Sequence, residues 1–160
     1  MSPREFLDVV VRPNIDEFLA HYDDLRRAYN AIMATDALAA HLYDWSRQNA
    51  PGEVTGINPR DGDSAYRVRL AEQNVDFKLL RDLAKAQKHV ELHRHDPLIK
   101  RSDQMLSRSI AWGEARWGEG RFGGVPQVVV EGAPGGLRYV ETVLRRSVAF
   151  LEAQLVRLGI

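Results

Sequence analysis

Hydrophobic positions in the middle of the chain, from residue 76 to 96, repeat with a helical period. Apolar side chains recur at the i, i+4, i+7 and i+11 positions of one helix face: Leu79, Leu83, Ala86 and Val90, with Leu80 beside them. Asp76 is the expected N-cap, and Pro97 disfavours helical geometry in the residue before it. The pattern predicts one continuous amphipathic helix from about 76 to 95.

Capping signals and helical spacing also organise the N-terminal part of the chain, residues 3–49. Ser2 and Glu5 fit a capping box with Pro3 at the first helical position, and Pro13 is expected to kink or restart this helix. Asp23 or Asp24 then caps a pattern that runs to about residue 49. The pattern fits one long helix or two helices broken near residues 35–36.

The stretch 50–64 is rich in glycine and proline and has no hydrophobic period, so it is predicted to be a surface loop. Ser64 is the expected cap of a short helix that includes Tyr66, Val68 and Leu70 and leads into the central helix. Helices are therefore expected over about 65–95.

The part of the chain that follows Pro97 has strand signals. The runs 127–131 and 137–140 are β-branched or aromatic and are separated by five residues containing three glycines, which predicts a β-hairpin. A run around residues 104–112 is a candidate third strand. The last stretch has leucines and a valine in a 4-3-4-3 spacing, which predicts a helix over about 141–158: Leu144, Val148, Leu151, Leu155 and Leu158.

These elements predict an α+β fold that is mainly α. We expect a bundle of four or five helices with a small antiparallel hairpin or three-stranded sheet, at about 103–140, inserted before the C-terminal helix. A chain of 160 residues fits a single domain over 1–160 and can bury roughly 70% of its unfolded surface.

Composition limits the classes of partner. The 22 basic and 22 acidic residues cancel, so net charge does not drive the chain onto nucleic acid or an anionic membrane. There is no cysteine, which excludes disulfide and thiolate chemistry. Because no long uncharged apolar window and no apolar leader segment are present, we expect a cytoplasmic protein without membrane association.

An aromatic–glycine pair recurs every five residues in the stretch WGEARWGEGRFGG, residues 112–124. The rings and the arginines are candidate binding residues for unstacked bases or for a protein surface: Trp112, Arg116, Trp117, Arg121 and Phe122. Glu114 and Glu119 offset the two arginines, which argues against a basic nucleic-acid groove. The alternative is a glycine-rich loop whose rings cover apolar surface of the bundle.

Charge and histidine gather on the central helix. The segment 77–108 holds eight Lys/Arg against four Asp/Glu, so Lys85 and Lys88 are candidate RNA-binding residues. Arg81, Asp82 and His89 are candidate catalytic residues, because an imidazole suits general acid–base work near neutral pH. The alternative is a solvated helix face on which Asp82 and His89 pair.

A metal site is a weaker expectation for the same helix. His89 and His93 are four residues apart and His95 follows, but zinc needs three or four converging ligands and no complete signature is present. We predict neither a metal nor any other cofactor, and a metal-binding bundle that uses His89 and His93 stays an alternative.

Two resemblances follow from these motifs. Arg81-Asp82 followed by His89 resembles, in part, the HEPN group of helical domains, whose metal-independent ribonucleases use an arginine, a polar residue and a histidine in one helix. Seven residues separate Arg81 from His89, which is more than the four to six of that group. Over nearly the whole chain, the order of VVRP, RDLAKAQKHVEL, the WGEG and FGG repeat, a hairpin and a final helix resembles a bacterial family of uncharacterised proteins.

The sequence favours a non-catalytic interaction module that self-associates, as a dimer, through the final helix or the aromatic–glycine loop, or that binds another protein. The HEPN resemblance implies an alternative, a domain that binds or cleaves RNA.

Overall fold

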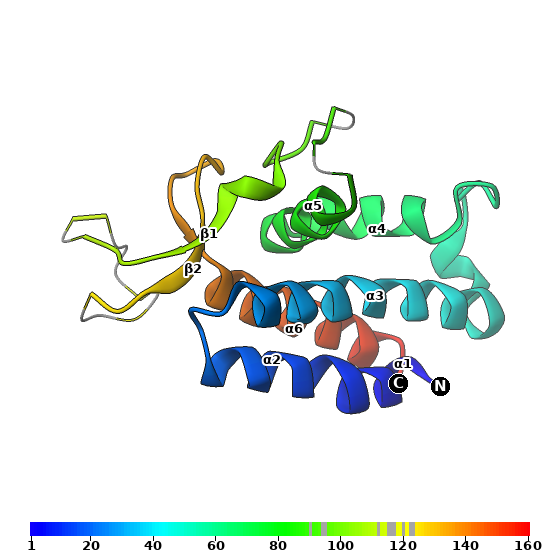
Figure 1. The fold of residues 1–160 in the computed structure, drawn as a ribbon. Helices are drawn as coiled ribbons and strands as arrows, with labels where there is room; N and C mark the ends of the chain where they lie inside the picture. Colours follow the sequence, from blue (N-terminus) through cyan, green and yellow to red (C-terminus); the bar gives the residue numbers. More distant parts are fainter. Residues whose placement is uncertain (90, 94–95, 112, 115–117, 120, 122–123) are drawn as a thin grey trace.

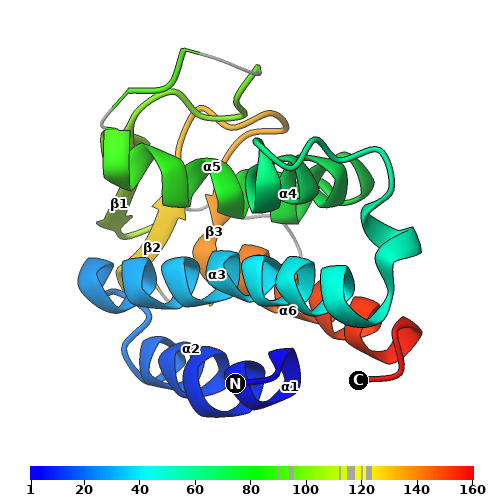
Figure 2. The ribbon, with the colours of Figure 1, turned by 90° about the vertical axis from the view of Figure 1, so that its right-hand side faces the viewer.

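The computed structural model describes residues 1–89, 91–93, 96–111, 113–114, 118–119, 121 and 124–160. Its helices form three layers (Figures 1 and 2). The helices α1 (Pro3–Phe6) and α2 (Arg12–Ala20) form one outer layer, α3 (Leu25–Asn49) and α6 (Val140–Arg157) form the middle, and α4 (Gly62–Gln73) and α5 (Val75–His89) form the other outer layer. A small sheet lies at one end of the bundle, which confirms the predicted fold class.

The N-terminal layer begins with the predicted capping box. The Ser2 hydroxyl accepts a hydrogen bond from the backbone N–H of Glu5 at 3.2 Å, and the Glu5 carboxylate accepts one from the N–H of Ser2 at 2.7 Å. A π-helical turn over Leu7–Val11 precedes α2, and Pro13 lies in the first turn of α2. The wider turn changes the register of the backbone before the proline, which agrees with the predicted restart.

The long helix α3 is unbroken, so the first of the two predicted alternatives is correct. Asp24 caps it by accepting a hydrogen bond from the N–H of Arg27 at 3.1 Å. The buried Thr35 hydroxyl donates to the carbonyl of Ala31 at 2.8 Å, so this polar group is satisfied within the helix.

The next two helices begin slightly before the predicted caps. A short 3-10 helix, Pro51–Val54, interrupts the predicted loop, and α4 begins at Gly62 rather than after Ser64. The Asn74 side chain accepts a hydrogen bond from the N–H of Phe77 at 2.8 Å. Asn74 therefore caps α5, and the prediction that Asp76 is the cap was wrong.

The predicted end of α5 at about residue 95 was also wrong, because the helix ends at His89. Beyond that point the chain returns along itself: Glu91 forms an antiparallel bridge with Arg101, and the N–H of Leu92 donates to the carbonyl of Lys100 at 2.7 Å. These backbone partners compete with the helical ones, and the polar sequence after residue 90 has no apolar row that would favour continuing the helix. Val90, the last position of the predicted row, lies outside the described residues.

Three short antiparallel strands make the sheet, in the order β1 (Met105–Arg108), β2 (Gln127–Val130) and β3 (Arg138–Tyr139). Val129 in the central strand lies opposite Leu106 on one side and Tyr139 on the other. The hairpin and the third strand were both predicted. The N–H of Val128 donates to the carbonyl of Tyr22 at 2.9 Å, which ties the sheet to the turn between α2 and α3.

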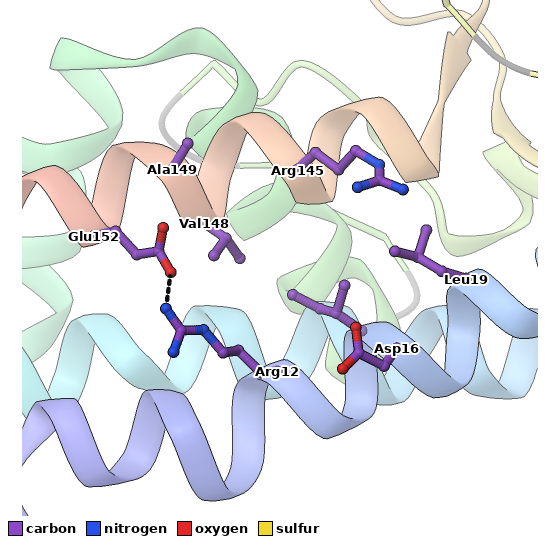
Figure 3. A pocket seen from close by; sticks show the side chains of 8 residues that line it. Arg12, Asp16, Leu19, Arg145, Val148, Ala149 and Glu152 are labelled. Carbon is purple, nitrogen blue, oxygen red and sulfur yellow. Dashed lines mark hydrogen bonds and ion pairs between the residues drawn. The ribbon is translucent and has the colours of Figure 1, made fainter.

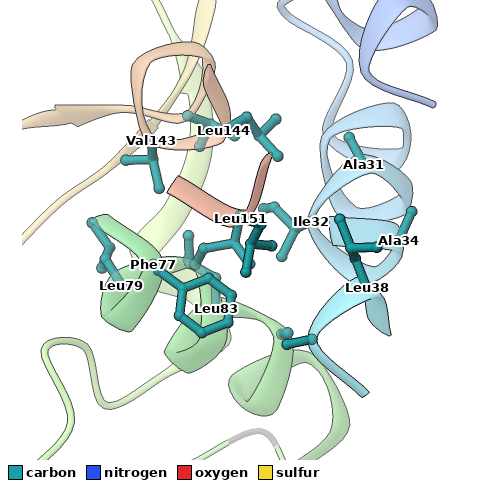
Figure 4. Packing of buried hydrophobic residues seen from close by; sticks show 14 of the residues in the cluster. Ala31, Ile32, Ala34, Leu38, Phe77, Leu79, Leu83, Val143, Leu144 and Leu151 are labelled. Atoms are coloured by element: carbon teal, nitrogen blue, oxygen red, sulfur yellow. The ribbon is translucent and has the colours of Figure 1, made fainter. Parts of the chain in front are cut away.

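The core lies where α3, α5 and α6 meet (Figure 4). Its side chains come from all three helices and are almost fully buried: Ile32, Leu38, Phe77, Leu79, Leu83, Val143, Leu144, Leu151 and Leu155. Three leucines of the C-terminal 4-3-4-3 row are among them. These three leucines therefore pack inside the chain, and dimerisation through them would require opening the core.

No helix in the described part of the chain is both long and apolar enough to cross a bilayer. The cytoplasmic location stays a prediction.

Candidate functional site

The three candidate catalytic residues do not share one site within the chain. Arg81 and Asp82 are buried, with 5% and 4% of their surface exposed, whereas His89 is exposed at the last position of α5. Asp82 accepts a hydrogen bond from the N–H of Leu98 at 2.8 Å, so it anchors the segment that follows the helix. Among the described residues, no hydrogen bond or ion pair joins His89 to Arg81 or Asp82.

Asp82 nonetheless has unusual electrostatics. Burial raises the pKa of its carboxyl group, although the Leu98 N–H and the charge of Arg81 act in the opposite direction. A raised pKa alone does not make an acid catalyst, because the carboxyl group must also reach a substrate. The backbone bond to Leu98 gives Asp82 a structural role.

Arg81 belongs to a buried charge cluster between α3, α4 and α5, formed by Asp36, Asp63, Arg67, Arg81, Asp82 and Lys85. Asp36 on α3 is only 4% exposed, and its carboxylate accepts a hydrogen bond from the Arg67 guanidinium on α4 at 2.7 Å. Arg67 also pairs with Asp63, one turn earlier on the same helix. The cluster therefore joins the middle layer of helices to an outer layer.

Several polar atoms in this buried charge cluster have no hydrogen-bond partner. They include Oδ1 of Asp36 and Nε of both Arg67 and Arg81. Burial raises the pKa of Asp36 in spite of four nearby cations, and burial lowers the pKa of Arg81. Such groups are expensive to desolvate, and native structures keep few of them without a partner.

Two lysines of α5, Lys85 in the cluster and Lys88 beside it, lie closer to solvent than Arg81. Lys85 is half-buried, and burial together with the charge of Arg81 lowers its pKa. Lys88 is exposed at the next-to-last position of α5, and its charge acts on Asp36. Both lysines were predicted as binding residues for RNA, which stays a prediction.

Asp36 was not singled out from the sequence, although a signal was present. It lies four residues after Ile32 and three before Ala39, both of which are fully buried. A charged residue in register with a buried apolar row on a helix has to find a partner in the interior. The partners Arg67 and Arg81 could not be paired with it from the sequence, because they come from two other helices.

Of the aromatic–glycine candidates, only Arg121 lies in the described part of the chain; Trp112, Arg116, Trp117 and Phe122 lie outside it. The Arg121 guanidinium is 4.1 Å from the centre of the Tyr22 ring and forms an ion pair with Glu141 at 3.4 Å. Arg121 thus connects this loop to the α2–α3 turn and to α6. The role of the repeat as a stacking surface is still a prediction.

The histidine candidates for a metal site are spread out. His89 and His93 are both exposed, and His93 lies 3.8 Å from the Glu91 carboxylate. His95 lies outside the described residues. Within the described ranges, no group of three or more His, Cys, Asp or Glu side chains is placed to hold a metal ion.

A groove between α2 and α6 is the other candidate site (Figure 3). We call it the α2–α6 groove; it has a volume of about 240 Å³ and is lined by Arg12, Ile15, Asp16, Leu19, Arg145, Val148, Ala149 and Glu152. Arg12 on α2 donates a hydrogen bond to Glu152 on α6 at 2.7 Å and closes one end. Arg145 on α6 and Asp16 on α2 lie toward the other end.

Two valines are exposed, one on α6 and one on the π-helical turn before α2. Val9 and Val156 are 63% and 71% exposed. Val156 lies one turn after Glu152 on α6, so it extends the α6 side of the groove beyond the ion pair. None of the groove residues was predicted as part of a site, because the sequence of each helix alone shows only the usual boundary between an apolar and a polar face.

Comparison with protein-family models, with curated proteins and with solved structures finds no match to this chain. The resemblances to a bacterial family and to HEPN domains therefore stay predictions. Any conclusion about function depends on the geometry of the two candidate sites.

Proposed function

We propose that this protein is a non-catalytic interaction module that forms a homodimer through the α2–α6 groove. The observation that carries the proposal is the combination of an apolar floor, a charged rim and the exposed Val156 on the α6 side of the groove. Exposed apolar surface rimmed by polar residues is typical of protein-binding sites. The cytoplasmic location predicted from the sequence is part of this proposal.

The charges of the rim support a second copy of the chain as the partner. Arg12 and Arg145 are balanced by Asp16 and Glu152, so the face is neutral and carries both signs. A twofold interface brings the same surface together from both subunits, so each sign must be present for the charges to complement one another. In such a dimer, Asp16 could pair with Arg145 of the partner subunit. A nucleic acid would require an excess of basic residues here instead.

The test is sedimentation velocity over a concentration series, with Ala149→Glu as the disrupting variant. Ala149 is an exposed residue of α6 that lines the groove, and glutamate is compatible with a helix. We expect the parent protein to dimerise and Ala149→Glu to dimerise about tenfold or more weakly, because a larger and charged side chain would have to be desolvated in the interface.

A matched control is Gln73→Glu, which adds the same charge at an exposed position of α4 in the opposite outer layer. This control should dimerise like the parent, and circular dichroism should show that both variants keep their helices. A parent protein that stays monomeric at the highest concentration, or an Ala149→Glu variant that associates as strongly as the parent, would show that the proposal is wrong.

A further inference from the structure

We infer that Arg81 and Lys85, in the buried charge cluster, bind the phosphate group of a small molecule. This site lies between the middle layer and the α4–α5 layer, whereas the α2–α6 groove lies on the other side of the middle layer (Figures 1 and 2). The inference therefore does not depend on the proposed dimer. It depends on the state of Arg81, on the charge balance around it and on the hydrogen-bonding groups nearby.

Arg81 is a buried cation on which the carboxylates of Asp82 and Asp36 act without forming an ion pair in the described part of the chain. Only 5% of its surface is exposed, its Nε has no hydrogen-bond partner, and no ion pair within 4.0 Å links its guanidinium to another described residue. A guanidinium group is a rigid fork of donors that matches the oxygens of phosphate or carboxylate. Because burial of an unpaired charge is costly, a bound oxyanion would supply the missing partner.

The carboxylates of Asp82 and Asp36 offset part of the charge of Arg81, and the cluster taken together with Lys88 carries one cation more than it has carboxylates. Asp36 is influenced by four cations, and Asp82 by a further lysine, while Asp63 pairs with Arg67. The balance is four cations against three carboxylates: Arg67, Arg81, Lys85 and Lys88 against Asp36, Asp63 and Asp82. A bound anion would reduce the mutual repulsion of the cations.

Lys85 has the position that a second ligand-binding residue needs. It follows Arg81 by four residues on α5, so both side chains lie on the same side of the helix. Because Lys85 is half-buried whereas Arg81 is buried, a phosphate group held by both would lie toward the solvent side of the guanidinium. Like Arg81, it forms no ion pair with another described residue.

Asp36 favours phosphate over a simple carboxylate. Its Oδ1 is buried and has no hydrogen-bond partner, and it belongs to the same cluster. A monoprotonated phosphate group offers oxygens to Arg81 and Lys85 and also an O–H that can donate to a carboxylate. Acetate offers no such donor once it is ionised, so it should bind more weakly.

The experiment measures the thermal unfolding of the full chain in inorganic phosphate, glycerol 2-phosphate and acetate, each against sodium chloride of equal ionic strength. Binding to the folded state alone raises Tm with ligand concentration. We expect inorganic phosphate to raise Tm above the chloride value and acetate to raise it less. A response to glycerol 2-phosphate as well identifies a phosphate monoester as an acceptable ligand.

Variants assign the response to the site. In Arg81→Met the phosphate-dependent rise should disappear, while Tm in chloride should equal or exceed that of the parent, because an unpaired buried charge has been replaced by an apolar side chain of similar length. Lys85→Gln, at a half-buried position, should bind phosphate about tenfold more weakly. The matched control is Arg60→Gln, in the exposed loop, which should respond like the parent.

Two results would overturn the inference. One is a parent protein whose Tm in phosphate does not differ from that in chloride. The other is a response that survives in both Arg81→Met and Lys85→Gln, which would place the bound anion elsewhere. If Arg81→Met does not fold, the parent and Lys85→Gln measurements decide the question alone.

Discussion

At the scale of single residues, buried charge is the most distinctive property of this protein. Asp36, Arg81 and Asp82 are each at most 5% exposed. Burial shifts the pKa of each in the direction that favours the neutral form of the side chain. Neighbouring opposite charges reduce these shifts without cancelling them. The folded state therefore bears an electrostatic cost near neutral pH that ordinary surface residues do not impose.

Asp82→Asn tests this cost. Folding raises the pKa of Asp82. The contribution of Asp82 to stability is therefore fully present below the pKa that it has in the unfolded chain, and it is lost as the pH rises through the raised pKa of the folded state. Asparagine can still accept the Leu98 N–H bond without a charge. We expect the urea midpoint of the variant, relative to that of the parent, to increase from pH 4 to pH 7.

Asp23→Asn is the control, because Asp23 is exposed in the turn before α3. Its midpoint should follow that of the parent across the same range. If the difference in urea midpoint between Asp82→Asn and the parent stays constant with pH, burial of the Asp82 charge does not cause the electrostatic cost.

At the scale of elements, the ends of helices and strands depend on specific hydrogen bonds more than on propensity. Asn74 sets the start of α5, and the backbone bond from Leu92 to Lys100 stabilises the segment beyond its end. Gln104 plays a similar part at the sheet: its side-chain oxygen accepts from the N–H groups of Lys100 and Arg101, and its amide donates to the carbonyl of Glu131. One side chain thus joins the start of β1 to the end of β2.

Gly132→Ala should disturb this junction. Gly132 has a φ of +71°, and a Cβ atom there would lie 2.8 Å from Nε2 of Gln104, whose side chain is held by three hydrogen bonds. We expect a loss of about 1–2 kcal/mol in the free energy of unfolding, from the left-handed backbone alone. Gly52→Ala is the matched control, since no atom lies within 4 Å of its added Cβ. Equal denaturant midpoints for the two variants would contradict this account.

At the scale of the whole molecule, one ion-pair network joins the sheet to the bundle. Asp76 at the start of α5 pairs with Arg138 on β3, and Arg146 on α6 lies 3.8 Å from the same carboxylate. Arg146 also lies 3.4 Å from the buried Glu119. The network therefore brings together segments that are far apart in the sequence, and it complements the apolar core between α3, α5 and α6.

Arg138→Met should destabilise the whole domain. Arg138 and Asp76 are 8% and 7% exposed, so removal of the arginine leaves a buried carboxylate whose remaining ion pair is the longer one with the exposed Arg146, at 3.8 Å. We expect a loss of about 3 kcal/mol in the free energy of unfolding, measured by urea denaturation. Arg101→Met, which breaks the exposed pair with Asp103, should change the free energy of unfolding much less, because solvent screens that pair. A loss no larger than that of Arg101→Met would rule out a structural role for the network.

The sequence by itself determined the local architecture. Apolar periodicity, caps and glycine-rich turns depend on residues within a few positions of one another, so the long helix from Leu25, the hairpin and the final helix from Val140 could all be predicted. Tertiary structure decided what involves distant residues: the end of α5 at His89, the burial of the final leucine row and the separation of His89 from Arg81. It also brought Asp36 to Arg67 and α2 to α6. Contacts between segments far apart in the chain follow from packing of the whole domain, which no local pattern encodes.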